Sequence, residues 1–517
     1  MDHEVLGRWE LPGNLRQELD ELDWSRMHGG HRHAPSVAFF EVASGNTIGG
    51  LSLVGQLIAR QRDGDRPLDS EDAAEIAILR LWAGLVEHRH DQEAIRDAML
   101  LLATTPAPDS ARRALLHLNL AATLQEHLLR VDLAEMDLIE HHLSSARHLA
   151  QLLGLPRIEA AALSRLALMD MLRGRVPAAL HHTAAVRALV AAGGTDFGHS
   201  WRHRIVPVEQ WGLHALNLPT DVETLLSLMR ELESNRRSVI VCATTASATA
   251  LALIDQGRLE VTRRMLERVL DEPIAREAGP WLVVLAILDG YLAINSQDDR
   301  RFVSALRRLR EFGSLAEANL LEATVLVQRA EHPRALELLE QVTSGELPAL
   351  SLTYPSACVL HAVVLYRVGQ SREASHLLAQ ALADTQRTSA LRPFTIHDPH
   401  VIRPILSSVD PDTPALRSWL EQVRSAVDAM LASPLNGRTS VPLPTEQGSV
   451  RKPSPLTPRE AEVLALAAAG ADQAAIARNL YLSVNTVKTH LRAVRRKLDV
   501  DRTSEAVTIA SREGWMG

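Results

Sequence analysis

Lysine is almost missing from this sequence of 517 residues. Only three lysines occur, and the first 451 residues contain none, although they are rich in arginine. A phosphate-binding P-loop, a pyridoxal phosphate enzyme and a protein kinase each depend on a lysine, so these classes are excluded from that part of the chain. The Gly-rich stretch 45–50 lacks this lysine too, and we interpret it as a turn.

Cysteine and long apolar runs are also scarce. Cys242 and Cys358 cannot make a disulfide framework, and we expect both to be buried small hydrophobic residues in a reducing compartment. The acidic start does not resemble a secretory signal, and neither uncharged run, 42–59 or 347–366, is apolar enough to span a membrane. Because 46% of the residues are hydrophobic, a large buried core is expected. The sequence therefore predicts a folded cytoplasmic protein.

Charge is distributed unevenly along the chain. Residues 451–517 carry 11 basic and 7 acidic side chains, a net charge of +4, whereas the remaining residues carry 44 basic and 56 acidic ones, a net charge of −12. A small basic segment joined to a large acidic body indicates a module that binds a polyanion and a body that does not.

The body is predicted to be all-α, with helices joined in pairs by short turns. Apolar residues recur at helical spacing, and turn signals follow one another every 34–45 residues, the spacing of helix-pair repeats. Gly257 and Gly369 each end a first helix where a left-handed residue is needed. The predicted turns lie near Val131, Gly174, Pro219, Gly257, Gln297, Glu331 and Gly369.

These patterns divide the chain into four parts. Residues 1–68 stay unassigned, and residues 69–431 are the helical-repeat domain. Residues 432–455 are rich in proline and form the predicted linker. Residues 456–517 are predicted to form a helix-turn-helix domain of four short helices.

The C-terminal helices have clear start signals. Thr457, Pro458 and Glu460 make a capping box before the first helix, and Asp472 caps the second. The third helix spans 484–498, and Asp501 or Thr503 is the expected cap of the fourth. On the third helix a buried stripe is predicted at Val487, Leu491, Val494 and Leu498.

The other face of the third helix is basic. Lys488, Thr489 and Arg492 are the predicted base contacts, because Lys and Arg donate to guanine and the Thr methyl contacts thymine in the major groove. The predicted DNA backbone contacts are Asn485, Thr486, His490, Arg495, Arg496 and Lys497.

Residues 456–515 resemble the LuxR-type DNA-binding domain of bacterial regulators. The likeness includes Leu456-Thr-Pro-Arg-Glu-Ala-Glu-Val-Leu and Leu482-Ser-Val-Asn-Thr-Val-Lys-Thr-His-Leu491. It implies binding to double-stranded DNA as a homodimer, with the side chains at 488, 489 and 492 facing the bases. Three departures are Ala474-Ala475 in place of a polar pair, Asp499 in place of Gly, and Thr503-Ser504 before Glu505.

The body resembles the tetratricopeptide-like region of the large LuxR regulators related to the maltose activator. Since no Walker lysine is present, the resemblance implies a shortened regulator without the ATPase module, with RNA polymerase as a further candidate partner. Two roles for the body stay open: sensing a small-molecule or protein effector, or acting as a scaffold for protein interaction or oligomerisation. An enzyme fused to a DNA-binding tail is a third alternative, but no catalytic residue, metal site or cofactor is predicted.

Several histidine and tryptophan residues are further candidates for a binding site. A metal site at His28, His31 and His33 is less favoured than a polar segment, because no cysteine is near. The pairs His88/His90, His141/His142 and His181/His182 lack the four-residue spacing of helical ligand pairs, so solvated or hydrogen-bonded positions are expected. Core positions are favoured over a ligand groove for Trp201, Trp211 and Trp281.

Overall fold

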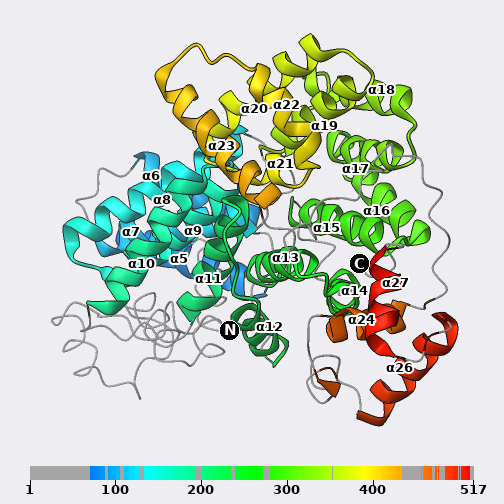
Figure 1. Cartoon of the computed structure of the whole chain (residues 1–517). Helices are drawn as coiled ribbons and strands as arrows, with labels where there is room; N and C mark the ends of the chain where they lie inside the picture. The colour runs from blue at the N-terminus through cyan, green and yellow to red at the C-terminus, as the bar shows by residue number, and fades with distance from the viewer. Residues whose placement is uncertain are drawn as a thin grey trace. The chain divides into compact units, whose positions relative to one another are not determined.

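The computed structural model forms two compact units, residues 1–444 and 445–517, and we describe each by itself. Every regular element in the described part of the chain is an α-helix, as the sequence predicts (Figure 1). The unassigned segment 1–68 and the predicted linker, apart from Ala432, lie outside the described residues. The structure describes residues 70–87, 91–104, 110–126, 133–192, 200–234, 239–271, 280–351, 353–432, 456, 458–468, 472–473, 476, 484–498, 500 and 502–512.

The body is an array of helix pairs, each made of a first helix (A) and a second helix (B). The A helices are α5 (Ser70–Glu87), α7 (Ala111–Glu126), α9 (Pro156–Leu172), α11 (Ser200–Ala215), α13 (Val239–Asp255), α15 (Pro280–Ser296), α17 (Leu315–Gln328) and α19 (Thr353–Arg367). The B helices are α6 (Gln92–Thr104), α8 (Leu133–Leu153), α10 (Val176–Ala191), α12 (Val222–Ser234), α14 (Leu259–Asp271), α16 (Asp299–Glu311), α18 (His332–Thr343) and α20 (Ser371–Thr388). Three more helices complete the body: α21 (Arg392–Thr395), α22 (Pro399–Ser408) and α23 (Pro414–Ala432).

Each A helix packs against the A helix of the next pair, from α5 through to α19, and each B helix also contacts the A helix that follows it. The A helices are therefore the more apolar and the more deeply buried; nearly every residue of α19 is buried, for example. Amphipathic B helices such as α16 bury only one stripe, formed by Ala305, Leu306 and Leu309. This packing is the tetratricopeptide-like arrangement that the repeat spacing predicts.

The described turns between an A helix and its B helix share one hydrogen-bonding pattern. At Gly257 (φ 66°) the amide donates to Ile254 and the next amide, of Arg258, donates to Leu253. Gly369 (φ 88°) repeats this pattern, which is the Schellman motif. The predicted left-handed residues at both glycines are thus confirmed. The motif also occurs with non-glycine residues at Asn217, Gln297 and Ala330.

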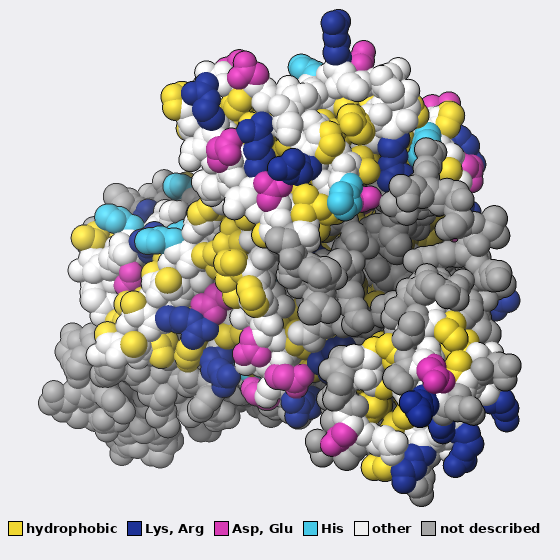
Figure 2. Space-filling view, viewed as in Figure 1, with side chains coloured by type: hydrophobic (Ala, Val, Ile, Leu, Met, Phe, Trp, Pro, Cys, Tyr) yellow, Lys and Arg dark blue, Asp and Glu magenta, His cyan; other side chains and the backbone are white. Residues whose placement is uncertain are grey.

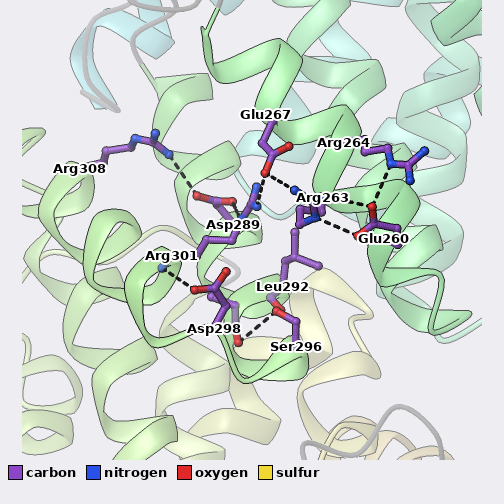
Figure 3. A network of polar contacts seen from close by, with 11 residues as sticks. Glu260, Arg263, Arg264, Glu267, Asp289, Leu292, Ser296, Asp298, Arg301 and Arg308 are labelled. Atoms are coloured by element: carbon purple, nitrogen blue, oxygen red, sulfur yellow. Dashed lines mark hydrogen bonds and ion pairs between the residues drawn. The ribbon is translucent and has the colours of Figure 1, made fainter. Parts of the chain in front are cut away.

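Buried charge joins three successive helices in the middle of the array (Figure 3). The Asp289 carboxylate of α15 is 3% exposed and pairs with Arg301 at 2.5 Å and Arg308 at 3.1 Å, both on α16. Arg301 also pairs with Glu267 of α14 at 3.0 Å. Removing one member of such a network leaves the others as buried charges without a partner, which is strongly destabilising. The network therefore fixes the register of α14, α15 and α16.

A cavity of about 230 Å³ lies among the A helices α9 to α19. The chain segment that follows α20, residues 390–396, forms one wall of it. This segment is held in place by contacts distant in sequence: the Leu391 amide donates to the Ala215 carbonyl at 2.9 Å, and Arg392 pairs with Asp255. The cavity is thus bounded by helices of the array and by the segment that leaves it.

The other candidate residues fall mainly into structural positions. Cys358 is buried, and burial raises the pKa of its thiol to about 12, whereas Cys242 is only half-buried, contrary to expectation. Trp281 is in the core as expected, but Trp211, also buried, lines the cavity. Arg187 stacks on the half-buried Trp201, 5.7 Å from the ring centroid.

Two of the histidine pairs lie within the described residues. Nδ1 of His142 shares a hydrogen bond with Nδ1 of His117, and Nδ1 of His182 donates to the Asp170 carboxylate, each at 2.9 Å. The other two groups, at 28–33 and 88–90, lie outside the described residues. Within the described ranges, His, Cys, Asp and Glu form no group of three that could hold a metal ion, and no helix is long and apolar enough to cross a membrane.

The buried contact between His117 of α7 and His142 of α8 makes stability depend on pH. Its two Nδ1 atoms are 2.9 Å apart, so one must keep a lone pair, and both rings cannot be protonated. Burial, aided by the neighbouring histidines, lowers the pKa of His117 to about 3 and that of His142 to about 4. In the unfolded chain both pKa values return to about 6.5, so the unfolded chain takes up protons that the folded one does not.

We therefore expect the free energy of unfolding to be greatest above about pH 6.5 and to fall as the pH drops toward 4. Urea unfolding of His142→Gln at neutral and acidic pH should show a weaker pH dependence than the unmodified chain. His181→Gln, at an exposed position on α10, serves as the control and should leave the profile unchanged. An unaltered profile for His142→Gln would contradict this role of the pair.

Candidate nucleic-acid interface

The C-terminal unit is built around three described helices, α24 (Pro458–Ala468), α26 (Val484–Leu498) and α27 (Thr503–Arg512), which all contact one another. The bounds of α26 are those that the sequence predicts. Of the predicted second helix, only part is described: the Ile476 amide donates to the Asp472 carbonyl at 2.9 Å, as expected if Asp472 is the N-cap. The predicted turn at 479–482 lies outside the described residues.

The predicted buried stripe of α26 is confirmed. Val487 and Val494 are fully buried, Leu491 is 6% exposed, and Leu498 is half-buried. They contact the apolar residues of the other helices in two clusters, which include Val463, Leu464, Ile476, Ala506 and Ala510. Because one face of α26 is fixed against this core, its opposite face must point to solvent.

The exposed face of α26 carries the predicted DNA contacts. Lys488, Thr489 and Arg492 are exposed, and Arg496 continues the row one turn further along. His490 and Arg495 are half-buried, and the side chains of Asn485 and Thr486 lie outside the described ones. Figure 2 shows Lys and Arg side chains gathered over this helix. The exposed face of α26 is therefore cationic, and the packing of the other face against the core of the domain fixes the orientation of the helix.

Lys497 has a role that the sequence did not reveal. Its Nζ lies 2.6 Å from Oε2 of Glu460 on α24, and the Glu460 side chain is only 7% exposed. Predicted as a capping-box residue, Glu460 thus neutralises a lysine 37 residues away in the sequence and ties α24 to the end of α26. Whether Lys497 also contacts phosphate stays a prediction.

The fourth helix starts differently from expectation. The sequence predicts Asp501 or Thr503 as its cap, but α27 begins at Thr503, which makes Arg502 the N-cap residue. The Arg502 amide donates to the Glu505 carboxylate at 3.2 Å, and its carbonyl accepts from the Ala506 amide at 3.2 Å. Glu505 therefore supplies one half of a capping box, with Arg502 at the N-cap position.

A buried apolar core, an exposed cationic helix and the order of the elements define this unit as a helix-turn-helix domain. Residues 454–510 match the family model described as bacterial regulatory proteins, luxR family, and this segment is a LuxR-type domain. The family match confirms the resemblance inferred from the motifs.

Relatives of known name cover parts of the chain. The uncharacterized transcriptional regulatory protein YvfU of Bacillus subtilis is 40% identical over 67 residues, 13% of this chain and 34% of that protein. The transcriptional regulatory protein DesR of the same organism is 39% identical over 62 residues, 12% of this chain and 31% of that protein. The proposed HTH-type transcriptional regulator Rv0890c of Mycobacterium tuberculosis is 31% identical over 170 residues, 31% of this chain and 18% of that protein. The chain thus spans about a fifth to a third of the length of these relatives.

The Glu460–Lys497 pair generates a prediction about the stability of this domain. Replacing Glu460 with Ala removes a buried partner of a charged group, and we expect a loss of about 1–3 kcal/mol in the free energy of unfolding. Urea unfolding of the fragment 450–517 measures this. Arg496→Ala, which changes an exposed residue of the same helix, should leave the stability close to that of the unmodified fragment. Equal midpoints for all three proteins would contradict a structural role for the pair.

Proposed function

We propose that this protein is a sequence-specific, DNA-binding transcriptional regulator whose helical-repeat body senses an effector and controls the C-terminal domain. The observation that carries the DNA-binding part is the exposed row of Lys488, Arg492 and Arg496 on a helix whose other face is locked in the core of a LuxR-type domain. In this proposal Lys488, Thr489 and Arg492 read bases, and the remaining basic residues contact phosphates. Two copies bind two half-sites.

The cavity in the body favours an effector over a scaffold without a ligand. A scaffold that only binds other proteins needs an extended groove or an exposed apolar patch, whereas a small-molecule receptor needs a concave, mostly apolar pocket with a few polar groups. The space among α9 to α19 has mostly apolar walls with His214, Asp255, Glu317 and Arg392 converging on it. Exposed large apolar residues in the described part of the body are spread over many helix pairs, for example Leu100, Val303 and Val368.

The base-reading role is tested by substitution on α26. We expect Lys488→Ala and Arg492→Ala each to lower affinity for the preferred DNA site by about 1–3 kcal/mol and to relax sequence preference. Arg496→Ala should weaken binding to all sequences alike and reduce the slope of log affinity against log salt by about one. Titrations of labelled DNA at several salt concentrations measure both quantities.

The matched control for these variants is Arg334→Ala, which removes an exposed arginine of the body. It should leave affinity and salt dependence unaltered. If Lys488→Ala and Arg492→Ala kept the sequence preference of the unmodified protein, another face of the domain would have to read the bases.

A further inference from the structure

The charged residues in the wall of the cavity differ in whether they have a partner of opposite charge, and this difference indicates which class of molecule the cavity suits. Most of its wall is apolar: Leu251, Ile254, Val284, Leu320 and Ile396 lie there with Trp211. Such a surface favours an apolar ligand, since burying its hydrocarbon removes it from water at no cost in hydrogen bonds. The identity of the ligand's polar group then depends on the few charged residues in the wall.

The positive charge in the wall is already neutralised. The Arg392 guanidinium pairs with Asp255 and donates to Oδ1 of Asn217 at 3.1 Å. Asp255 in turn lies 2.9 Å from Nδ1 of His214, whose pKa is lowered by burial, so that the imidazole is neutral near pH 7. Arg392 and Asp255 form a closed pair that holds the segment 390–396 against α11 and α13, and they leave no net charge for a ligand.

Glu317, another charged residue in the wall of the cavity, has no such partner. The residue is 3% exposed and lies in the first turn of α17. Its carboxylate accepts the Leu350 amide at 2.8 Å, and its other contacts are with the Thr353 side chain and its own amide. Among the described residues, no lysine, arginine or histidine pairs with it. A buried carboxylate held only by neutral donors is costly when ionised, and a ligand cation would remove that cost.

A purely structural role does not account for this position. Holding the Leu350 amide requires one hydrogen-bond acceptor, which a neutral glutamine would also provide. Glu317 instead contributes to the wall of a mostly apolar cavity.

We propose that this cavity binds an apolar molecule that carries an ammonium or similar cationic donor group, with Glu317 as the counter-ion. The proposal rests on the effector role proposed above and specifies the class of effector. The ligand's apolar part lies against the inner A helices and the segment 390–396. Helix α21 belongs to that segment and packs against α23, and both α22 and α23 pack against α20. A ligand that holds the segment in place therefore stabilises the end of the body that leads to the linker.

The test uses three probes with one carbon skeleton and different charge: 4-phenylbutylamine, 4-phenylbutan-1-ol and 4-phenylbutanoate. Calorimetric titration of the full-length protein near neutral pH should rank the amine above the alcohol and the carboxylate last. In Glu317→Gln the amine should lose about tenfold or more in affinity while the alcohol changes little, as expected when a hydrogen bond to a charged group is removed. Glu322→Gln, on the same helix but outside the cavity, is the matched control and should bind all three probes as the unmodified protein does.

Three results would overturn the proposal: no binding of the amine at millimolar concentration, a carboxylate that binds as tightly as the amine, or an unchanged affinity of Glu317→Gln for the amine. The ranking on the unmodified protein decides the matter even if Glu317→Gln fails to fold, which a circular dichroism melt reveals. DNA affinity measured with and without the amine separates this proposal from the broader one. If the amine binds with the predicted ranking and DNA affinity does not change, the cavity assignment stands and the control of DNA binding by this ligand fails.

Discussion

A pair of antiparallel helices cannot bury its own apolar surface, and the whole body follows from that constraint. The A helices therefore stack on one another from α5 to α19, and each B helix covers the seam between neighbours. The stack tolerates little spare volume: a Cβ at Gly290 of α15 would lie 2.5 Å from a methyl group of Leu321 of α17. Where the inner helices do not meet, a cavity remains between them, and the segment 390–396 forms part of its wall.

The same constraint positions the basic surface of the C-terminal domain. Helix α26 is amphipathic, and burying Val487, Leu491 and Val494 leaves Lys488 and Arg492 in solvent. One basic residue of the domain, Lys497, stabilises the domain by pairing with Glu460. Folding and the proposed DNA contact thus depend on neighbouring residues of one helix, and substitutions can separate them because the two faces of the helix are distinct.

Much of the fold was predictable from local patterns. Glycines at 257 and 369 mark turns because few other residues adopt positive φ without cost, and the spacing of the stripe on α26 fixes its buried face. Gln297 and Ala330 adopt the same left-handed geometry, and turn signals at or beside them were enough to place those turns. The cap of α27 was mispredicted because several polar residues at its start compete, and only the structure shows that Glu505 reaches the Arg502 amide.

The cavity was not predictable, because its residues share no local pattern. Arg392 and Asp255 are 137 positions apart, and Glu317 belongs to a third helix pair. The sequence gives no periodic signal for contacts at that distance, and Trp211 was therefore assigned to the core alone. The charge network of Asp289 with Arg301 and Arg308 is not predictable for a different reason: other arginines on the B helices, such as Arg300, Arg307 and Arg310, look the same in sequence but are exposed.

The most direct test of the central claim, that α26 reads a DNA sequence, is selection of bound sites from random DNA at two salt concentrations, with the full-length protein beside the fragment 450–517. We expect the fragment to recover a motif of two half-sites at both salt concentrations, since base contacts add a preference that salt does not erase. Recovery of the same motif by the full-length protein would mean that the body does not inhibit under those conditions, and recovery by the fragment alone would mean that it does. Binding by both proteins without any preferred sequence, disappearing as salt rises, would contradict the assignment of Lys488, Thr489 and Arg492 to the bases.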